Sequence, residues 1–383
     1  MHSRITPGQI KKNNRQQIYN YIYEHEKVSL QEIVYALRLS RPTVSSNLAE
    51  LEEDGLITRN GTLDSDQIGR KAIAYSIVPD YRIAVGVEIL RKQVKLIAVD
   101  LYGKKIERDV PEIIYANDPG YYRALCERIN RFIDSLEQPN EKVLGIGISM
   151  QGLASPDGRT LVYGWILGCT YVSIDVFEKW LPYPCHFVHD PKGAALSELW
   201  SSPELTDAVY ISLSRHLGGA MISEGRVMPG KHGHNATFEH IQAVREGGEL
   251  CYCGHRGCWD TLCSMRALMG NQDADSFFEA ARTEGTPEAE RWREYLRALA
   301  RLIHDLHLMQ DVDIILGGHL APYFIDADIR FMYGEIRKLC PFEETDDFIH
   351  MSKMPSHNIT IGIALPYIRR FLDDIDANIE EMV

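Results

Sequence analysis

The first eighty residues carry three short helical patterns of apolar positions, one directly after another. Apolar side chains recur at i, i+3, i+4 and i+7 over residues 14–26 and again over residues 30–37. Ser29 precedes the second pattern, and Glu32 three positions later completes a capping box with it. The third pattern begins after Ser40, a residue type that caps helix N-termini well. The sequence therefore predicts three short helices joined by tight connections.

Only residues 38–40 separate the second helix from the third, as a helix-turn-helix requires. The outward positions of the third helix are expected to be polar, so that this helix can enter a major groove and contact base edges. These positions are Arg41, Thr43, Ser45, Ser46 and Asn47. Strands at residues 56–59 and 72–77 enclose a polar loop ending in Arg70 and Lys71, which predicts a wing with cations at its base. This order of elements favours a winged helix-turn-helix that binds double-stranded DNA over the alternative, a three-helix protein-docking module.

After the predicted wing, the pattern changes to strands that alternate with helices. Strands are expected at residues 83–89, 94–101, 104–110, 143–149, 185–188, 208–213 and 314–318. Helices are expected at residues 120–136, 192–200 and 287–310, and a glycine-rich hairpin through residues 218–219. The alternation indicates an α/β architecture, long enough for two lobes with a cleft. We therefore divide the chain into a winged helix over residues 1–80 and a larger domain over residues 81–383.

Composition places the chain among soluble globular proteins, with 45% hydrophobic and 25% charged residues and no apolar run long enough for a membrane span. The net charge of −13 is uneven, because residues 1–80 contain ten Lys or Arg and ten Asp or Glu. All the excess negative charge therefore lies in the larger domain, which phosphate would repel, and DNA contact is confined to the first domain. The N-terminus has no apolar stretch of a signal peptide, so we expect a cytoplasmic protein.

Eight cysteines in a reducing compartment suggest metal binding rather than disulfides. Cys251, Cys253 and Cys258 lie within eight residues, with Gly254 and Gly257 between the last two to permit a sharp turn. Three thiolates and one imidazole form the closed tetrahedral set of a structural zinc site. The fourth ligand is one of four nearby histidines: His232, His234, His240 or His255. The alternative is three buried cysteines that act as small apolar side chains.

Three segments of the larger domain resemble the ROK family, named for repressors, open reading frames and sugar kinases. They are the run from residue 229 through the cysteine cluster, residues 188–198, and residues 315–318. The resemblance covers nearly the whole chain, because repressors of this family also begin with a winged helix. It implies an actin- and hexokinase-like fold of two lobes, a sugar in the cleft, and a zinc knuckle over residues 240–258. It assigns the zinc ion (Zn²⁺) to His240, Cys251, Cys253 and Cys258.

The resemblance also shows where a kinase would bind its donor. Family kinases begin with an Asp-x-Gly pattern, to which Glu88–Arg91 correspond here, and we expect Ile89 and Leu90 to fill the space of the nucleotide phosphates. A second phosphate loop, Gly-Thr-Gly in kinases, is replaced by residues 214–216. Both changes argue against ATP chemistry, so we expect no enzyme. Asp190 matches the family's catalytic base and here would accept a hydrogen bond from a sugar hydroxyl, while also serving as a helix N-cap.

By the same resemblance, five residues are expected to contact the effector. They are His189, Asp190, Thr237, His240 and Asp260. His189 and Lys192 replace family asparagines, and Thr237 replaces a glutamate, which predicts a more cationic pocket and an acidic or phosphorylated effector.

The sequence therefore predicts a sugar-responsive transcription regulator, a repressor that forms a homodimer or dimer of dimers and reads a palindromic operator without any membrane partner. Two alternatives stay open. The chain could be an active sugar kinase with an appended DNA reader, or a ligand-independent DNA-binding protein with a vestigial cleft.

Overall fold

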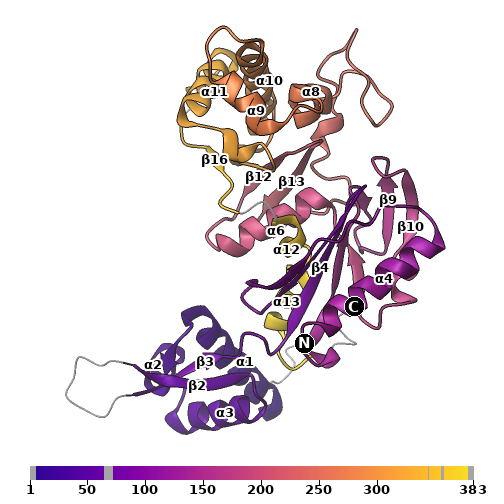
Figure 1. Cartoon of the computed structure of the whole chain (residues 1–383). Coiled ribbons are helices and arrows are strands. Elements are labelled where there is room, and N and C mark those ends of the chain that lie inside the picture. Colours follow the sequence, from indigo (N-terminus) through magenta and orange to yellow (C-terminus); the bar gives the residue numbers. More distant parts are fainter. Residues whose placement is uncertain (1–5, 64–71, 344, 355–357, 378–383) are drawn as a thin grey trace.

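The computed structural model describes residues 6–63, 72–343, 345–354 and 358–377 of the chain. Figure 1 shows three parts in a row: the winged helix, a first lobe built around β4, and a second lobe that contains β12 and β13. The chain crosses from the first lobe to the second through α6 and returns at its end to the first lobe. The C-terminal helix α13 consequently lies beside the winged helix (Figure 1).

The winged helix contains the three predicted helices and a three-stranded sheet of order β1-β3-β2. The helices are α1 (Pro7–His25), α2 (Leu30–Leu37) and α3 (Arg41–Glu53), and the strands are β1 (Val28–Ser29), β2 (Ile57–Leu63) and β3 (Ala72–Ile77). Ser29 and Ser40 cap α2 and α3, and Ser29 forms the expected capping box with Glu32. The first helix begins seven residues earlier than predicted, because Thr6 and Gln9 form a second capping box ahead of it.

The first lobe is a five-stranded sheet of order β11-β7-β4-β5-β6. Its strands are β4 (Ile83–Ile89), β5 (Val94–Val99), β6 (Lys105–Asp109), β7 (Val143–Ser149) and β11 (Cys185–Phe187). The central strand β4 pairs antiparallel with β5 and parallel with β7. One face is covered by α4 (Pro119–Asp134), α5 (Asp175–Glu178) and a small sheet of β8 (Leu153–Ala154), β9 (Thr160–Gly164) and β10 (Cys169–Ser173).

The other face of the first lobe packs against the end of the chain, α12 (Asn358–Gly362) and α13 (Leu365–Asp373). This contact is unusually close. A Cβ atom added at Gly86 would lie 1.8 Å from the carbonyl oxygen of Thr360, and one at Gly147 would lie 1.8 Å from that of Ile363. Glycine in the sheet is therefore what allows the returning chain to approach.

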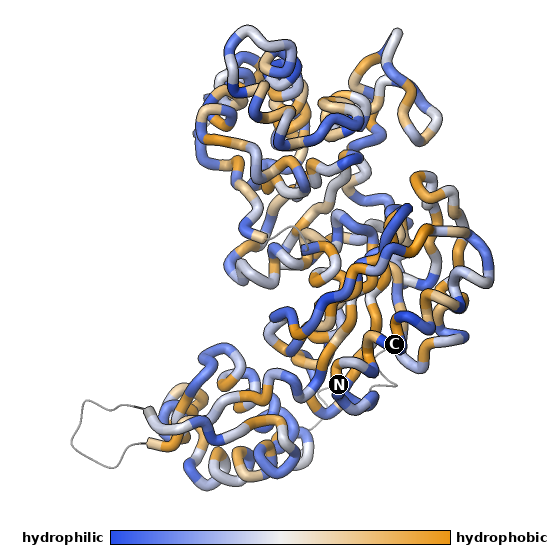
Figure 2. Tube along the Cα trace, viewed as in Figure 1, coloured by the Kyte–Doolittle hydropathy of each residue, from blue (hydrophilic) through white to orange (hydrophobic). Residues whose placement is uncertain are grey.

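The second lobe has a sheet of order β14-β13-β12-β15-β16. Its strands are β12 (Ala208–Leu213), β13 (Leu217–Ser223), β14 (Arg226–Val227), β15 (Asp313–Gly317) and β16 (Ile349–Met351). Its helices include α7 (Asp260–Cys263), α8 (Met265–Met269), α9 (Ala274–Ala281), α10 (Pro287–Gln310) and α11 (Asp326–Leu339). These helices pack on one face of the sheet, and α6 (Asp190–Ser201) packs on the other. Figure 2 shows the strands of both lobes as largely hydrophobic. Within the described residues, no helix is long and apolar enough to cross a membrane.

The expected glycine-rich hairpin through residues 218–219 is formed by β12 and β13, with both glycines inside β13 and the turn at residues 214–216. Gly219 has a packing role instead. A Cβ atom there would lie 2.2 Å from the ring of Phe238, which covers the strand. The glycine pattern was therefore a sign of close packing rather than of a turn.

The winged helix and the first lobe share one hydrophobic cluster. The ring of Tyr19 on α1 meets the ring of Phe371 on α13 edge to face, with centroids 6.4 Å apart. The amide of Gln16 donates to the carbonyl oxygen of Leu372 at 2.7 Å and accepts from the backbone N–H of Ile375 at 3.0 Å. The winged helix is thus packed against the C-terminal helix α13 and is not joined to the rest of the chain by a flexible linker alone.

A second contact joins α1 to the turn that follows β5. Tyr23 donates from its hydroxyl to the carbonyl oxygen of Leu101 at 3.1 Å and stacks on the ring of Tyr102 at 4.9 Å. From the opposite side, the indole N–H of Trp200 donates to the carbonyl oxygen of Tyr102 at 2.8 Å. Trp200 lies near the end of α6, so this turn connects α6 with the winged helix.

Candidate functional site

The candidate DNA-reading surface is the exposed face of α3. Arg41, Ser45 and Ser46 are exposed there, as the sequence predicts. Thr43 is half-buried, and its hydroxyl lies 2.7 Å from that of Ser40 at the helix N-terminus. Three of the five DNA contacts predicted on α3 are therefore exposed to solvent, where they can meet a base edge or phosphate, although the hydroxyl of Ser46 also lies 3.4 Å from a carboxyl oxygen of Glu50. Thr43 takes part in the cap of the helix.

Asn47 does not lie on this face, which corrects the prediction. It is 4% exposed, its amide donates to the carbonyl oxygen of Thr43 at 2.8 Å, and its Oδ1 is buried without a partner. The reason is helical spacing, since Val44, Asn47 and Leu48 share one buried stripe. The predicted wing cations Arg70 and Lys71 lie outside the described residues.

The second lobe contains a group of four side chains that could hold a metal ion. One ligand atom from each of His240, Cys251, Cys253 and Cys258 lies within 4.8 Å of all the others. Tetrahedral metal–sulfur bonds of about 2.3 Å place neighbouring ligand atoms roughly 3.8 Å apart. The sulfurs of Cys253 and Cys258 are 3.8 Å apart, and the sulfur of Cys251 is 3.7 Å from Nδ1 of His240. The residues present therefore fit a small tetrahedral cation.

His240 is the histidine that completes this group. His255, an alternative by sequence, lies with Nδ1 3.7 Å from the sulfur of Cys253 but is exposed and outside the group. His232 and His234 are outside it too. The turn between the cysteines depends on Gly257, whose φ is +76° and whose Cβ would lie 2.0 Å from a carbonyl oxygen.

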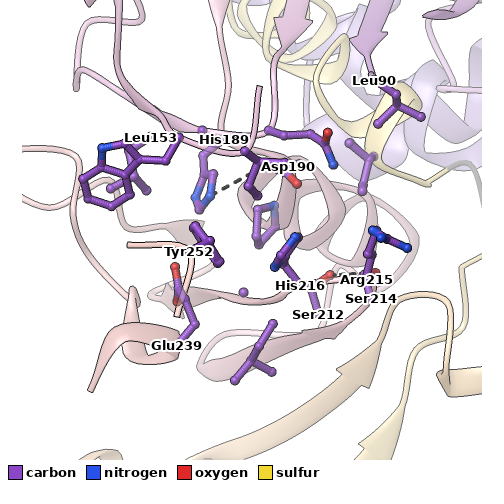
Figure 3. Close-up of a pocket in the computed structure, with 18 of the residues that line it drawn as sticks. Leu90, Leu153, His189, Asp190, Ser212, Ser214, Arg215, His216, Glu239 and Tyr252 are labelled. Atoms are coloured by element: carbon purple, nitrogen blue, oxygen red, sulfur yellow. Dashed lines mark hydrogen bonds and ion pairs between the residues drawn. The ribbon is translucent and has the colours of Figure 1, made fainter. Parts of the chain in front are cut away.

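A cavity of about 250 Å³ opens between the two lobes. It is lined by β4, α6, the β9–β10 hairpin, the turn before β13 and the segment that carries the metal ligands. Figure 3 shows His189 and Asp190 side by side in this pocket, with Glu239 and Tyr252 toward one side and Ser214 and Arg215 toward the other. The predicted effector residues His189, Asp190 and His240 are thus brought together.

Asp190 is the first residue of α6, and the N-cap is His189, which corrects the expected cap role of the aspartate. Burial, and secondarily the charge of Glu88, raises the pKa of the Asp190 carboxyl to about 6. His189 lies with Nε2 3.6 Å from Asp190 Oδ1, and its Nδ1 is buried without a partner. Burial and the charge of Lys192 lower the pKa of His189 to about 3, so this imidazole is neutral.

Glu239 is a pocket residue that the sequence analysis missed. Its side chain is 3% exposed and its Oε2 is buried without a hydrogen-bond partner, and burial raises the pKa of its carboxyl to about 8. The family resemblance places a glutamate three residues before His240, where this chain has Thr237. The chain instead makes a single 3₁₀ turn over Phe238–His240, which brings the residue directly before the histidine into the pocket.

Three other predicted pocket residues do not line the cavity. Thr237 is half-buried, and its hydroxyl donates to the carbonyl oxygen of His234 at 2.9 Å. Asp260 is 0% exposed and accepts from the backbone N–H of Leu217 at 2.9 Å, so it lies behind the pocket wall. The Lys192 ammonium donates to two backbone carbonyl oxygens, at 3.0 and 2.8 Å, and is turned away from the cavity. The prediction of a more cationic pocket is therefore weakened, because Lys192 is turned away, His189 is neutral and Glu239 lines the cavity.

The donor side of the cleft differs from the prediction in one residue. Leu90 lines the cavity as expected, together with residues 214–216. Ile89 is 0% exposed and belongs to the core of the first lobe, because it points to the opposite face of β4. Glu88 is held by the ammonium of Lys95 at 3.2 Å and by the hydroxyl of Thr360 at 2.8 Å. The carboxylate of Glu88, at the position of the aspartate in family kinases, is thus already paired.

Comparison with known proteins decides the family. The model of the ROK family matches residues 84–336, which is more than half of the chain, and that of the MarR family matches residues 18–64 within the winged helix. The chain belongs to the ROK family. The resemblance to the ROK family is confirmed, as is the predicted fold of a winged helix followed by an actin- and hexokinase-like domain of two lobes.

Among the relatives of this ROK protein is the DNA-binding transcriptional dual regulator NagC of Escherichia coli (strain K12), 27% identical over 264 residues. That match covers 68% of this chain but only 64% of NagC. The xylose repressor of Bacillus subtilis is 23% identical over 266 residues, covering 68% of each chain. An N-acetylmannosamine kinase of Vibrio cholerae is 26% identical over 216 residues, which is 52% of this chain and 71% of the kinase.

Solved structures share the fold, one of them along almost the full length of the chain. A ROK family transcriptional regulator, a homolog of the E. coli MLC protein, matches with a TM-score of 0.73 at 20% identity, over 95% of this chain and 97% of the other. A ROK family glucokinase from Streptomyces griseus, in complex with glucose and AMPPNP, matches with a TM-score of 0.63 at 21% identity. It covers 74% of this chain and 98% of the kinase.

Proposed function

We propose that this ROK protein is a transcription regulator of carbohydrate metabolism, which binds double-stranded DNA through α3 and a sugar or sugar derivative in the cleft. The observation that carries the proposal is the packing of a winged helix, with Arg41, Ser45 and Ser46 exposed on α3, against a kinase-like domain. Relatives named as a DNA-binding regulator and as a xylose repressor support it. We expect repression as the mode of regulation, as in the second of these relatives.

The chemistry of the inner pocket favours a hydroxyl-rich effector without a negative charge. Asp190 and Glu239 offer carboxyl oxygens, and the neutral His189 offers a ring nitrogen that has no partner. Sugar hydroxyls can donate to and accept from such groups. An anionic effector beside Asp190 would find the nearby Lys192 engaged with backbone carbonyls, and Arg215 lies toward the other side of the pocket (Figure 3). We therefore propose a neutral sugar as the effector in place of the acidic or phosphorylated one expected from the sequence.

We further propose that this cleft does not transfer phosphate. A kinase needs the donor-side carboxylate and small neighbouring residues to position the metal and phosphates. Here Glu88 is paired with Lys95 and Thr360, and Leu90 projects into the cavity. Asp190 would then position a hydroxyl without activating it for reaction.

The metal that we assign to His240, Cys251, Cys253 and Cys258 is zinc in a structural role. Three thiolates and an imidazole are a closed ligand set, which leaves no open position for a water molecule. When bound, zinc would cross-link the segment that presents Glu239 and His240 to the pocket. We also keep the homodimer or dimer of dimers as a proposal, since a twofold assembly would read a palindromic operator.

The test is selection of DNA by the full-length protein from a random duplex pool, followed by fluorescence anisotropy with the selected sequence. The expected result is one enriched motif and a dissociation constant that changes at least about tenfold when a bound sugar is present, which is a coupling of about 1.4 kcal/mol. Ser45→Ala is expected to change the selected sequence, because α3 reads base edges. Arg70→Ala or Lys71→Ala is expected to weaken binding to all sequences and lower its salt dependence.

Other outcomes would point to the two alternatives. ATP-dependent phosphorylation of a hexose at an ordinary enzymatic rate would establish a sugar kinase with a DNA reader. Specific DNA binding that no sugar changes, together with no sugar binding in calorimetry, would establish a ligand-independent protein with a vestigial cleft. Failure to enrich any DNA sequence would contradict the proposal as a whole.

A further inference from the structure

The β9–β10 hairpin carries three aromatic side chains that form an aromatic strip: Tyr163, Trp165 and Tyr171. The ring of Tyr163 lies 5.0 Å from that of Trp165 and 6.4 Å from that of Tyr171, so the three are continuous. Trp165 is 44% exposed and Tyr171 is 70% exposed. Contiguous exposed aromatic surface of this kind usually marks a binding site.

The strip is not needed to hold the hairpin in the fold. Four other apolar side chains of this segment already enter the core of the first lobe: Leu161, Leu167, Cys169 and Val172. Tyr171 is also held in an unfavourable backbone conformation, with φ at +57°. A left-handed conformation of a non-glycine residue costs about 1–2 kcal/mol, and retention of that cost at an exposed position suggests a use for the side chain.

The strip is continuous with the effector cavity. Tyr163, Trp165 and the neighbouring Ile166 line the same cavity as Asp190 and Glu239. Across the cleft, the ring of Trp165 lies 5.9 Å from His240, on the segment of the second lobe that carries the metal ligands. The cavity therefore has a polar inner end with unpartnered polar atoms and an aromatic outer end that is open to solvent.

The position of the hairpin tip is defined by a contact from the sheet. The guanidinium of Arg91, just after β4, donates to the carbonyl oxygen of Ile166 in the β9–β10 turn. The turn that carries Trp165 is thus tied to the strand that ends at the cleft. The aromatic end is consequently positioned relative to the polar end, as a site for one extended ligand requires.

We infer that the cleft takes a saccharide of at least two rings, a disaccharide or a longer glycoside, whose second ring stacks on Trp165. This inference rests on the proposed function, in which the first ring lies beside Asp190 and Glu239. The apolar C–H face of a pyranose ring can pack on an aromatic ring while its hydroxyls remain in water. Tyrosine and tryptophan suit this position because each has an apolar ring and a polar tip.

The test is calorimetry of the full-length protein with three matched pairs of probes: glucose and cellobiose, N-acetylglucosamine and N,N′-diacetylchitobiose, and xylose and xylobiose. For the pair that binds, the disaccharide is expected to bind about fivefold to tenfold more tightly than the monosaccharide, a range set by one aromatic stacking contact. Trp165→Ala is expected to bring this ratio to about one, and Trp165→Phe to retain most of it. Phe342→Ala, which removes an exposed aromatic ring of the second lobe, is the matched control and is expected to leave the ratio unchanged.

The outcomes separate this inference from the proposed function. Equal affinity for both members of a binding pair, or an unchanged ratio in Trp165→Ala, would overturn the second-ring site and leave the sugar-binding cleft standing. Absence of binding by all six sugars would contradict the sugar-binding function itself, and the second-ring site with it.

Discussion

Removal of one proposed zinc ligand is expected to lower the thermal stability of the second lobe. It is also expected to weaken sugar binding, because the same segment lines the pocket. Cys253→Ser is the most informative change, because Cys253 is only half-buried and its sulfur lies 3.8 Å from that of Cys258. The serine hydroxyl is a poor replacement for a thiolate ligand. The core of this lobe is otherwise left intact, so the effect reports on the metal.

The magnitude follows from the segment that the metal closes. Its outermost ligands are His240 and Cys258, so the bound ion cross-links a loop of about 20 residues. By the chain-entropy argument used for disulfides, a cross-link over a loop of this size contributes about 3 kcal/mol. For a lobe of this size, that corresponds to a fall in Tm of about 10 °C.

The assay combines metal analysis of the purified protein, thermal unfolding and sugar calorimetry. Wild-type protein is expected to contain one zinc ion per chain, and Cys253→Ser far less, with a lower Tm and weaker sugar binding because Glu239 and His240 are released. Cys340→Ser is the matched control, since Cys340 is a half-buried cysteine of the same lobe outside the ligand group. A Cys253→Ser protein with full zinc content and an unchanged Tm would refute the assignment.

Three further outcomes are expected. Asn47→Ala should change the unfolding free energy by no more than about 1 kcal/mol, because it removes one hydrogen bond together with an unpartnered buried oxygen. It should leave the DNA sequence preference unchanged, and a changed preference in a selection experiment would show that residue 47 contacts bases. Sugar affinity should fall as the pH drops below about 6, because the pKa of Asp190 is raised to about 6 and a protonated carboxyl is a weaker hydrogen-bond acceptor for a sugar hydroxyl than a carboxylate. The charged or titratable groups near Asp190 include His189, Glu88, His216, Lys95 and Glu239. A flat calorimetric pH profile between 5 and 7 would argue that Asp190 does not contact the sugar. Tyr23→Phe should reduce the effect of sugar on DNA affinity by up to about fivefold, since it removes one hydrogen bond of about 1 kcal/mol between α1 and the turn after β5, and an unchanged effect in anisotropy would place the coupling elsewhere.

The winged helix could be predicted closely because its signals are local. Serine caps at Ser29 and Ser40 set where two helices begin, and apolar spacing set which faces are buried. The same spacing should have excluded Asn47 from the exposed face, since it lies three residues after Val44 on the buried stripe. Polarity alone was a poor guide there, because a buried amide can bond the carbonyl of the preceding helical turn.

The metal group could be predicted because its ligands lie close together in the chain, and geometry then selected His240 among four histidines. The pocket could be predicted only in part. His189 and Asp190 are adjacent in sequence, whereas Glu239 reaches the cavity through a 3₁₀ turn that no spacing rule indicated. The aromatic outer wall was not predicted, because the β9–β10 hairpin is short and its position across from His240 depends on the packing of two lobes.

The coupling between cleft and DNA reader also depends on long-range contacts. The helix α6 begins with Asp190 in the pocket and carries Trp200 near its other end, where it bonds the turn that also holds Tyr23 of α1. Residues 98 and 78 positions apart meet there, so no local pattern could have indicated the junction. A rigid helix with one end in the pocket and the other at the DNA reader gives a physical route by which sugar could favour one arrangement of the winged helix.

The most direct test of this account is a reciprocal titration with the selected operator DNA and the sugar that binds the full-length protein. Sugar is expected to change the dissociation constant for DNA by at least about tenfold, and DNA is expected to change the dissociation constant for sugar by the same factor, because linkage requires it. Tight binding of both ligands, with neither affecting the other, would contradict the claim that the cleft regulates the DNA reader.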